Sequence, residues 1–212
     1  MSRKEVLFQY YYEHIRHNIV NFLKWLVLAV LTGLIVGGAS GIFAKCIGAA
    51  TAYRDAHIRI FLLLPFAGLL IVFLYQKLGS QDGGTNQVLA TIKSKDKIPF
   101  ISAPLIFLST LLTHLTGGSA GREGASIQFG GSLGSWLGKL AKLDEFDQHV
   151  MIMCGMSAAF AAVFGTPMAA AVFAMEVASV GVMYYAALFP CMIASIIASR
   201  FADGMGVNPE TF

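Results

Sequence analysis

Apolar residues occupy this chain in long blocks, separated by short polar segments that are rich in glycine or charge. Three blocks are long enough to cross a bilayer, which takes roughly 20 apolar residues in an α-helix; they cover residues 19–50, 58–78 and 184–201. Pro65 lies inside the second block and is expected to kink that helix. The pattern therefore predicts an all-α protein that crosses a membrane several times.

Other apolar segments are too short to cross and end at glycine, proline or charge: residues 85–92, 100–116, 150–165 and 166–181. The charged link "AKLDEFDQH" at 141–149 interrupts the pattern, and the last two segments meet at a Gly-Thr-Pro corner. Irregular backbone at membrane depth is tolerated only where it is buried or lines a cavity. Broken helices whose N-termini point at a midplane site are typical of transporters, so the pattern favours ion or anion transport.

The composition supports a membrane location. Hydrophobic residues make up 56% of the 212 and charged residues only 13%, about half the charged fraction of a soluble domain. Residues 1–18 predict an amphipathic helix on the cytoplasmic face, because their Arg and Lys precede the first apolar block. We expect residues 19–203 to form the membrane unit and residues 204–212 a polar tail.

The segment "GGSAGREGASIQFGGSLG", residues 117–134, concentrates the candidate chemistry. Residues 117–124 predict a glycine-rich loop between two half-helices, the second of which is expected to start near Gly124. Unpaired N–H groups and the positive end of the helix dipole make such a helix start an anion site. The stretches "DGGTN" at 82–86, "GTP" at 165–167 and "GGSLG" at 130–134 are expected to repeat the arrangement.

Glu123 is the main candidate for proton coupling. When ionised, its carboxylate occupies the place of an anion at the helix start, and when protonated it can swing away. The alternative is a structural one, in which Arg122 and Glu123 cap a buried loop; for Arg122, ion pairing or carbonyl contacts is the favoured interpretation. Carboxylates within membrane segments are usually functional, which favours the transport role for Glu123.

Several further residues are candidates with simpler explanations. His114 could relay protons, but a lone histidine on an apolar helix is more often a core residue. Ser119 could offer its hydroxyl to an anion or cap the turn. We interpret the Met and Cys residues of the apolar blocks as packing residues: Met151, Met153, Met156, Cys46, Cys154 and Cys191.

The residue types also argue against other classes of protein. No Ser/His/Asp arrangement or metal-ligand spacing is present, so we expect no enzymatic activity, no metal site and no cofactor. The net charge is +3, and the Lys and Arg residues lie mainly at the ends of apolar blocks and not in a basic stripe, so we expect no nucleic-acid partner.

"GGSAGREG", followed by "GMSAAFAAVFGTPMAAAVFAMEV", resembles the CLC family of chloride channels and proton-coupled anion antiporters. "THLTGGSAGREGASIQFG" is similar in particular to the bacterial branch that exchanges fluoride for protons. The resemblance implies that Glu123 is the gating glutamate, in a bacterial inner membrane. It further implies that anions contact the backbone amides of two helix starts, formed by Gly124, Ala125, Ser126 and Ile127 and, at the inner end, by Gly83, Gly84, Thr85 and Asn86.

The chain departs from the family pattern at three places. Chloride members carry Gly-Ser-Gly-Ile-Pro where this chain has "DGGTN", and Asn86 at the proline position favours the fluoride branch. The inner proton glutamate of chloride antiporters corresponds to Val177, beside Glu176, which resembles a mostly structural family residue. The family has two inverted repeats, whereas residues 19–203 resemble only the first, and we expect the second to be supplied in cis or by another chain.

Two hypotheses remain from the sequence. The first is halide transport, by fluoride/proton antiport or as a chloride channel, with fluoride, chloride and protons as the small partners. The second is a non-conducting membrane half that serves assembly. The resemblance implies a homodimer built on the last helices of this half.

Overall fold

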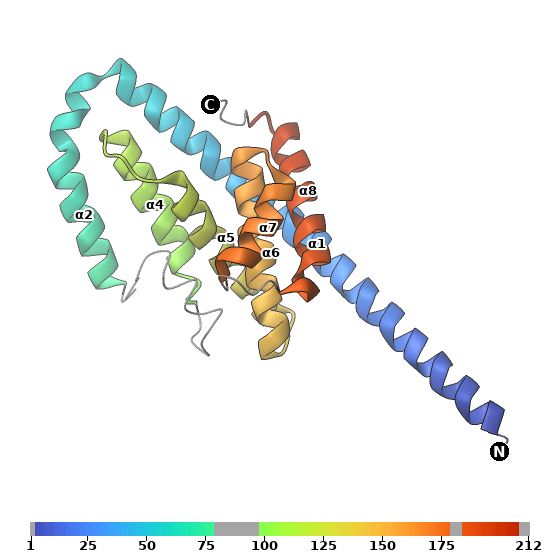
Figure 1. Cartoon of the computed structure of the whole chain (residues 1–212). Coiled ribbons are helices and arrows are strands. Elements are labelled where there is room, and N and C mark those ends of the chain that lie inside the picture. The colour runs from blue at the N-terminus through green and yellow to red at the C-terminus, as the bar shows by residue number, and fades with distance from the viewer. Residues whose placement is uncertain (1–2, 79–97, 179–183, 208–212) are drawn as a thin grey trace.

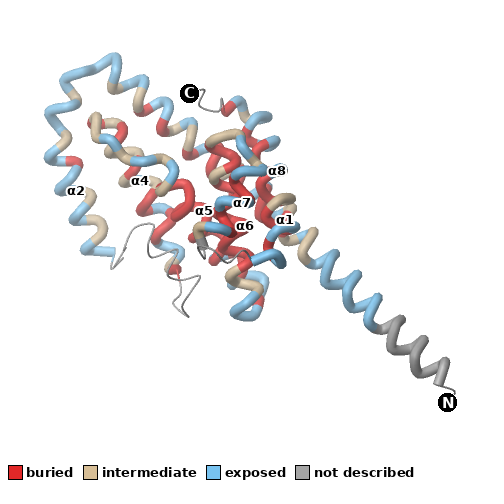
Figure 2. The backbone as a smooth tube through the Cα atoms, in the orientation of Figure 1, coloured by how far each residue is buried: buried red, intermediate tan, exposed pale blue. Residues whose placement is uncertain are grey.

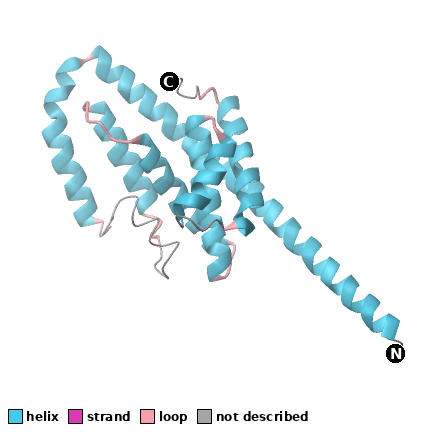
Figure 3. Cartoon of the chain, in the orientation of Figure 1, coloured by secondary structure: helices cyan, strands magenta, loops and turns pink. Residues whose placement is uncertain are grey.

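The computed structural model describes residues 3–78, 98–178 and 184–207, with the backbone alone for 3–13 and 178. Over these residues the chain is helical without any strand (Figure 3). The elements are α1 (Arg3–Ala56), η1 (Ile58–Leu63), α2 (Leu64–Lys77), α4 (Ser102–Leu115), α5 (Arg122–Leu140), α6 (Glu145–Phe164), α7 (Pro167–Ala178), η2 (Tyr185–Ala187) and α8 (Leu188–Gly204). The all-α prediction is confirmed.

Four helices of the described ranges are long and apolar enough to cross a membrane: His14–Ala56, Ile58–Lys77, Glu145–Phe164 and Tyr185–Gly204. The apolar helices α4 and α7 are shorter, as predicted. Helix α6 differs from its prediction, because the expected short segment 150–165 extends back through the charged link to Glu145. The cause is local, since the Asp144 side chain accepts a hydrogen bond from the Asp147 N–H at 2.8 Å and caps the helix.

Helix α1 is continuous over 54 residues, so the expected separate helix at 1–18 is wrong. No glycine or proline occurs between Arg3 and Thr32 to interrupt the helix. At 1.5 Å per residue its length is roughly 80 Å, far more than the hydrocarbon thickness of a bilayer. Its N-terminal part extends away from the other helices (Figure 1).

Pro65 does not kink a helix, contrary to expectation. The 3-10 helix η1 comes first, and Pro65 lies in the first turn of α2. A proline is tolerated there because its missing N–H would have no partner inside the helix. Helix α2 forms the outer edge of the molecule and is mostly exposed (Figures 1 and 2).

Helices α5 and α6 touch through their backbones. A methyl group placed on Gly130 would lie 2.3 Å from the Gly155 carbonyl oxygen, and one on Gly134 would lie 2.3 Å from the Met151 carbonyl oxygen. The expected helix start at "GGSLG" is therefore wrong. These residues lie in the middle of α5, where glycine is needed for close helix packing.

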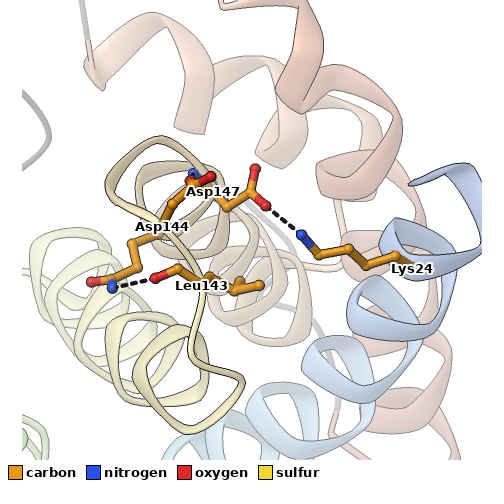
Figure 4. Close-up of polar contacts among 5 residues, drawn as sticks. Lys24, Leu143, Asp144 and Asp147 are labelled. Atoms are coloured by element: carbon orange, nitrogen blue, oxygen red, sulfur yellow. Dashed lines mark hydrogen bonds and ion pairs between the residues drawn. The ribbon is translucent and has the colours of Figure 1, made fainter. Parts of the chain in front are cut away.

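Helices α1 and α8 make a second close crossing. A methyl group placed on Gly33 would lie 2.8 Å from the Ala194 carbonyl oxygen, and one on Gly37 would lie 2.6 Å from the Ala198 Cα. At one end of this assembly, Lys24 of α1 forms an ion pair of 2.5 Å with Asp147 of α6 (Figure 4). Helix α1 is thus tied to both α6 and α8.

The buried centre contains the predicted packing residues. Met151, Met153 and Met156 are buried in α6. Cys154 and Cys191 are fully buried on α6 and α8 with their sulfur atoms 3.8 Å apart. Cys46 is only partly buried. The two buried thiols are 37 residues apart in sequence, so no local sequence pattern indicated that they lie next to each other.

Candidate functional site

The loop after α4 follows from a helix-ending motif. Gly117 has a φ of 87°, which favours glycine. Its N–H donates to the His114 carbonyl at 3.3 Å, and the Gly118 N–H donates to the Thr113 carbonyl at 2.8 Å. This Schellman pattern closes α4. The chain then reaches α5 within a few residues, so the polar loop stands between two helix ends, as predicted.

Helix α5 begins at Arg122, with Gly121 as the N-cap residue in an extended conformation. The expected start at Gly124 is therefore two residues too late. The physical reason is that nothing in Arg122 or Glu123 opposes a helix, and an acidic residue is favoured in a first turn. With this earlier start, Arg122 and Glu123 are themselves the first two residues of α5.

The Glu123 carboxylate lies at the N-terminus of its own helix. The residue is exposed and stands in the first turn of α5. A methyl group placed on Gly121 would lie 3.3 Å from its Oε2 atom, so the side chain folds back over the N-cap residue. A negative charge there interacts favourably with the partial positive charge at the helix start.

The four predicted ligand residues of α5 divide into two groups. Gly124 lies in the first turn, where backbone N–H groups have no partner inside the helix. The Ala125 N–H reaches the Gly121 carbonyl at 3.4 Å. Ser126 and Ile127 lie further in and are buried, and the Ser126 hydroxyl donates to the Arg122 carbonyl at 2.7 Å. The helix start therefore presents Gly124 more directly than the other three.

Arg122 also borders a cavity. The cavity has a volume of about 250 Å³ and is lined by Arg122 together with Lys45 of α1 and with Val163, Gly206 and Val207. Two cationic residues thus line it next to the start of α5. Lys45 was missed by the sequence analysis, because 77 positions separate it from Arg122 and its only signal was a lysine inside an apolar block.

The other predicted residues are placed as follows. Ser119 is exposed in the loop. His114 is buried, and its Nδ1 atom lies 2.9 Å from the Thr110 carbonyl oxygen, which fits a core residue. Glu176 is exposed on α7, whereas Val177 packs against a small apolar cluster.

The inner anion site proposed at Gly83, Gly84, Thr85 and Asn86 lies outside the described residues. In the part of the chain that the structure covers, no group of three or more His, Cys, Asp or Glu side chains is arranged to hold a metal ion.

Comparison with known proteins identifies the family. A family model described as "Voltage gated chloride channel" matches residues 67–212. The chain belongs to this family. A chloride/fluoride channel protein of Pseudomonas syringae pv. tomato is 41% identical over 186 residues, covering 87% of this chain and 41% of the relative. The H(+)/Cl(-) exchange transporter ClcA of Cronobacter sakazakii is 27% identical, covering 86% of this chain and 43% of the relative.

Solved structures agree with the family assignment. A CLC-type fluoride/proton antiporter superposes with a TM-score of 0.84 at 34% identity, covering 89% of this chain and 48% of the other. A slow cyanobacterial Cl⁻/H⁺ antiporter gives a TM-score of 0.63 at 26% identity, covering 84% and 46%. The chain therefore has the CLC fold and spans less than half the length of each of these four relatives.

Proposed function

We propose that the protein containing this chain moves a small halide across the membrane and exchanges fluoride for protons, with Glu123 as the gate. The observation that carries the proposal is the position of the Glu123 carboxylate over Gly121, at the N-terminus of α5. The names of two relatives, a chloride/fluoride channel protein and a fluoride/proton antiporter, support fluoride as the ion.

The gate works through competition for the helix start. An ionised Glu123 side chain places its own negative charge where an anion would be attracted. Protonation removes that charge, and the carboxyl group can then leave the helix start. Because the anion gains access only after a proton has bound, its movement is linked to a proton at Glu123.

The anion ligands proposed here are backbone N–H groups. Those of Arg122, Glu123 and Gly124 lie in the first turn, where the helix does not use them. The Ser119 hydroxyl is an additional donor in the same loop. Ala125, Ser126 and Ile127 support the helix behind this turn, and Gly83 to Asn86 remain the prediction for the inner end.

The proposed assembly is a homodimer in a bacterial inner membrane, with a cytoplasmic N-terminus. Helices α7 and α8 keep several large apolar side chains exposed: Met168, Val172, Phe173, Leu188, Phe189, Ile196 and Phe201. A second copy of the protein would cover this face. Crosslinking in membranes through cysteines placed on α7 and α8 tests the dimer.

The cytoplasmic position of the N-terminus is tested separately, with a reporter fused to the N-terminus.

The decisive experiment measures ion movement from liposomes that hold the full-length protein. Fluoride and chloride efflux and proton uptake are compared for wild type, Glu123→Gln and Glu145→Gln. We expect wild type to move fluoride and to drive protons in the opposite direction. The Glu123→Gln variant should lose proton movement, because an amide does not take up a proton in this pH range.

Glu145→Gln is the matched control, since Glu145 also lies in the first turn of an apolar helix, α6. It should retain fluoride/proton coupling. Chloride flux that ignores the proton gradient would indicate a channel instead. A folded protein that moves neither ion would contradict the proposal and leave the assembly role.

A further inference from the structure

A second recess lies at the corner where α1 passes into α2. It has a volume of about 470 Å³ and is lined by Arg54, Asp55, Ile58, Phe61, Leu62 and Gly117. The lining joins the end of α1 and the helix η1 to the loop that follows α4, and Figure 1 shows this corner above the end of α4. The recess is separate from the Arg122 cavity, with which it shares no lining residue.

The corner joins two helices that are candidates to cross the membrane. Helix α1 and the η1–α2 segment are both long and apolar enough to cross, and only His57 stands between them. We therefore expect the turn between them to lie at the headgroup level. The corner has the composition of such an interface, because Tyr53 stacks on His57 with ring centres 4.5 Å apart and the same segment contains Arg54 and Arg59.

The recess has a charged side and an apolar side. Arg54 donates to the Asp55 carboxylate at 2.7 Å and 3.0 Å. Arg59 is exposed on η1, next in sequence to the lining residue Ile58, so the segment 54–59 carries two guanidinium groups and one carboxylate. On the apolar side, Ile58 and Leu62 are 83% and 75% exposed. A ligand that fits both sides has an anionic head and a hydrocarbon chain.

The recess also touches the loop that leads to Glu123. A methyl group placed on Gly117 would lie 2.8 Å from the Phe61 ring and 3.6 Å from the Arg54 Cδ atom. One placed on Gly118 would lie 3.2 Å from a methyl group of Leu64. A molecule held in the recess therefore contacts the same turn that positions the start of α5.

We propose that this recess binds one anionic phospholipid, with its phosphate on Arg54 and Arg59 and an acyl chain along Ile58, Phe61 and Leu62, and that the bound lipid steadies the loop from Gly117 to Gly121. The charge of the corner selects an anionic headgroup over a zwitterionic one. The proposal goes beyond ion transport, and it is tested by binding without any flux measurement.

The test is native mass spectrometry of the full-length protein in detergent, with phosphatidylglycerol and phosphatidylcholine of identical chains. We expect wild type to retain one phosphatidylglycerol in preference to phosphatidylcholine. The Arg54→Gln and Arg59→Gln variants should each bind it about fivefold more weakly. Lys77→Gln, which removes a cation at the other end of α2, is the matched control and should bind as wild type does.

Two further measurements keep the result unambiguous. Leu62→Gln leaves both guanidinium groups in place and should weaken retention of long-chain but not of short-chain phosphatidylglycerol. Hydrogen exchange of the Gly117–Gly121 amides should slow several-fold when phosphatidylglycerol is added to wild type, but not to Arg54→Gln.

The proposal is overturned by equal retention of the two lipids or by the same loss in Lys77→Gln. Displacement of the lipid by inorganic phosphate at millimolar concentration would also overturn it, because it would mean a phosphate site without a chain contact. Exchange at the loop that does not respond to lipid would remove the coupling to the α5 start.

Discussion

Glycines in two regions of this protein have opposite surroundings. At the α5–α6 crossing, a methyl group on Gly130, Gly134 or Gly155 would approach facing backbone atoms to 2.3 Å or less. Elsewhere, methyl groups on Gly48 of α1, beside the Arg122 cavity, and on Gly68 of the outer helix α2 would meet nothing within 4 Å. The same residue type marks tight packing in one region and open surface in the other.

The contrast has a physical origin in the bilayer. Lipid chains are as apolar as leucine, so helices gain little by hiding apolar side chains from them and associate through close packing instead. Small residues stand where α5 meets α6 and where α1 meets α8, and these helices contribute to the buried centre (Figure 2). The exposed α2 keeps large side chains instead, such as Phe66 and Leu69.

The strongest test of this contrast is Gly134→Val. Its side chain would press on the Met151 backbone, which has no rotamer to relieve the contact. We expect a loss of at least about 3 kcal/mol of stability, at the upper end of overpacking effects. Thermal unfolding of the purified full-length protein, with the yield of monodisperse protein, measures this. Unfolding at the wild-type temperature would show that α5 and α6 are not in backbone contact.

A smaller effect is expected at the α1–α8 crossing. Gly37→Ala places a methyl group 2.6 Å from the Ala198 Cα and 2.8 Å from its Cβ, which should destabilise by about 1–3 kcal/mol. Replacing Ala198 by glycine in the same protein removes the second contact and should restore part of the stability. If the stability changes of Gly37→Ala and Ala198→Gly simply add in the double mutant, measured in the same unfolding assay, the two residues are not in direct contact.

The ion pair between Lys24 and Asp147 should contribute less. The two side chains are 41% and 24% exposed, and pairs of this kind contribute about 0.2–1 kcal/mol. Lys24→Gln should therefore lower the unfolding temperature slightly, and the difference should shrink in 1 M salt. Lys45→Gln, a lysine of the same helix outside this pair, serves as the comparison. Equal, salt-independent shifts in both variants would argue against the pair.

The smallest change is expected for Gly68→Ala on α2. Nothing lies within 4 Å of the added methyl group, and alanine is the better helix former. We expect the unfolding temperature to stay the same or to rise slightly. A destabilisation as large as that of Gly37→Ala would mean that α2 packs more tightly than the structure shows, and would remove the contrast between the two regions.

Part of the candidate site was predictable from local sequence, and part was not. The loop at residues 117–121 follows from the glycine spacing, so the sequence placed it between two helices. The start of α5 was misplaced by two residues because the first turn depends on Gly121 being extended, which glycine permits but does not require. The charged link before α6 was misjudged because the Asp144 cap outweighs its polarity.

The sequence by itself determined the membrane class, the all-α architecture, the short helices and the motif that holds Glu123, because these depend on composition and neighbouring residues. Only the tertiary structure decided which glycines carry backbone contacts, that Arg122 shares a cavity with Lys45, and that Cys154 meets Cys191. Those features join segments tens of residues apart. Their geometry is set by how closely two helices approach, which no local pattern specifies.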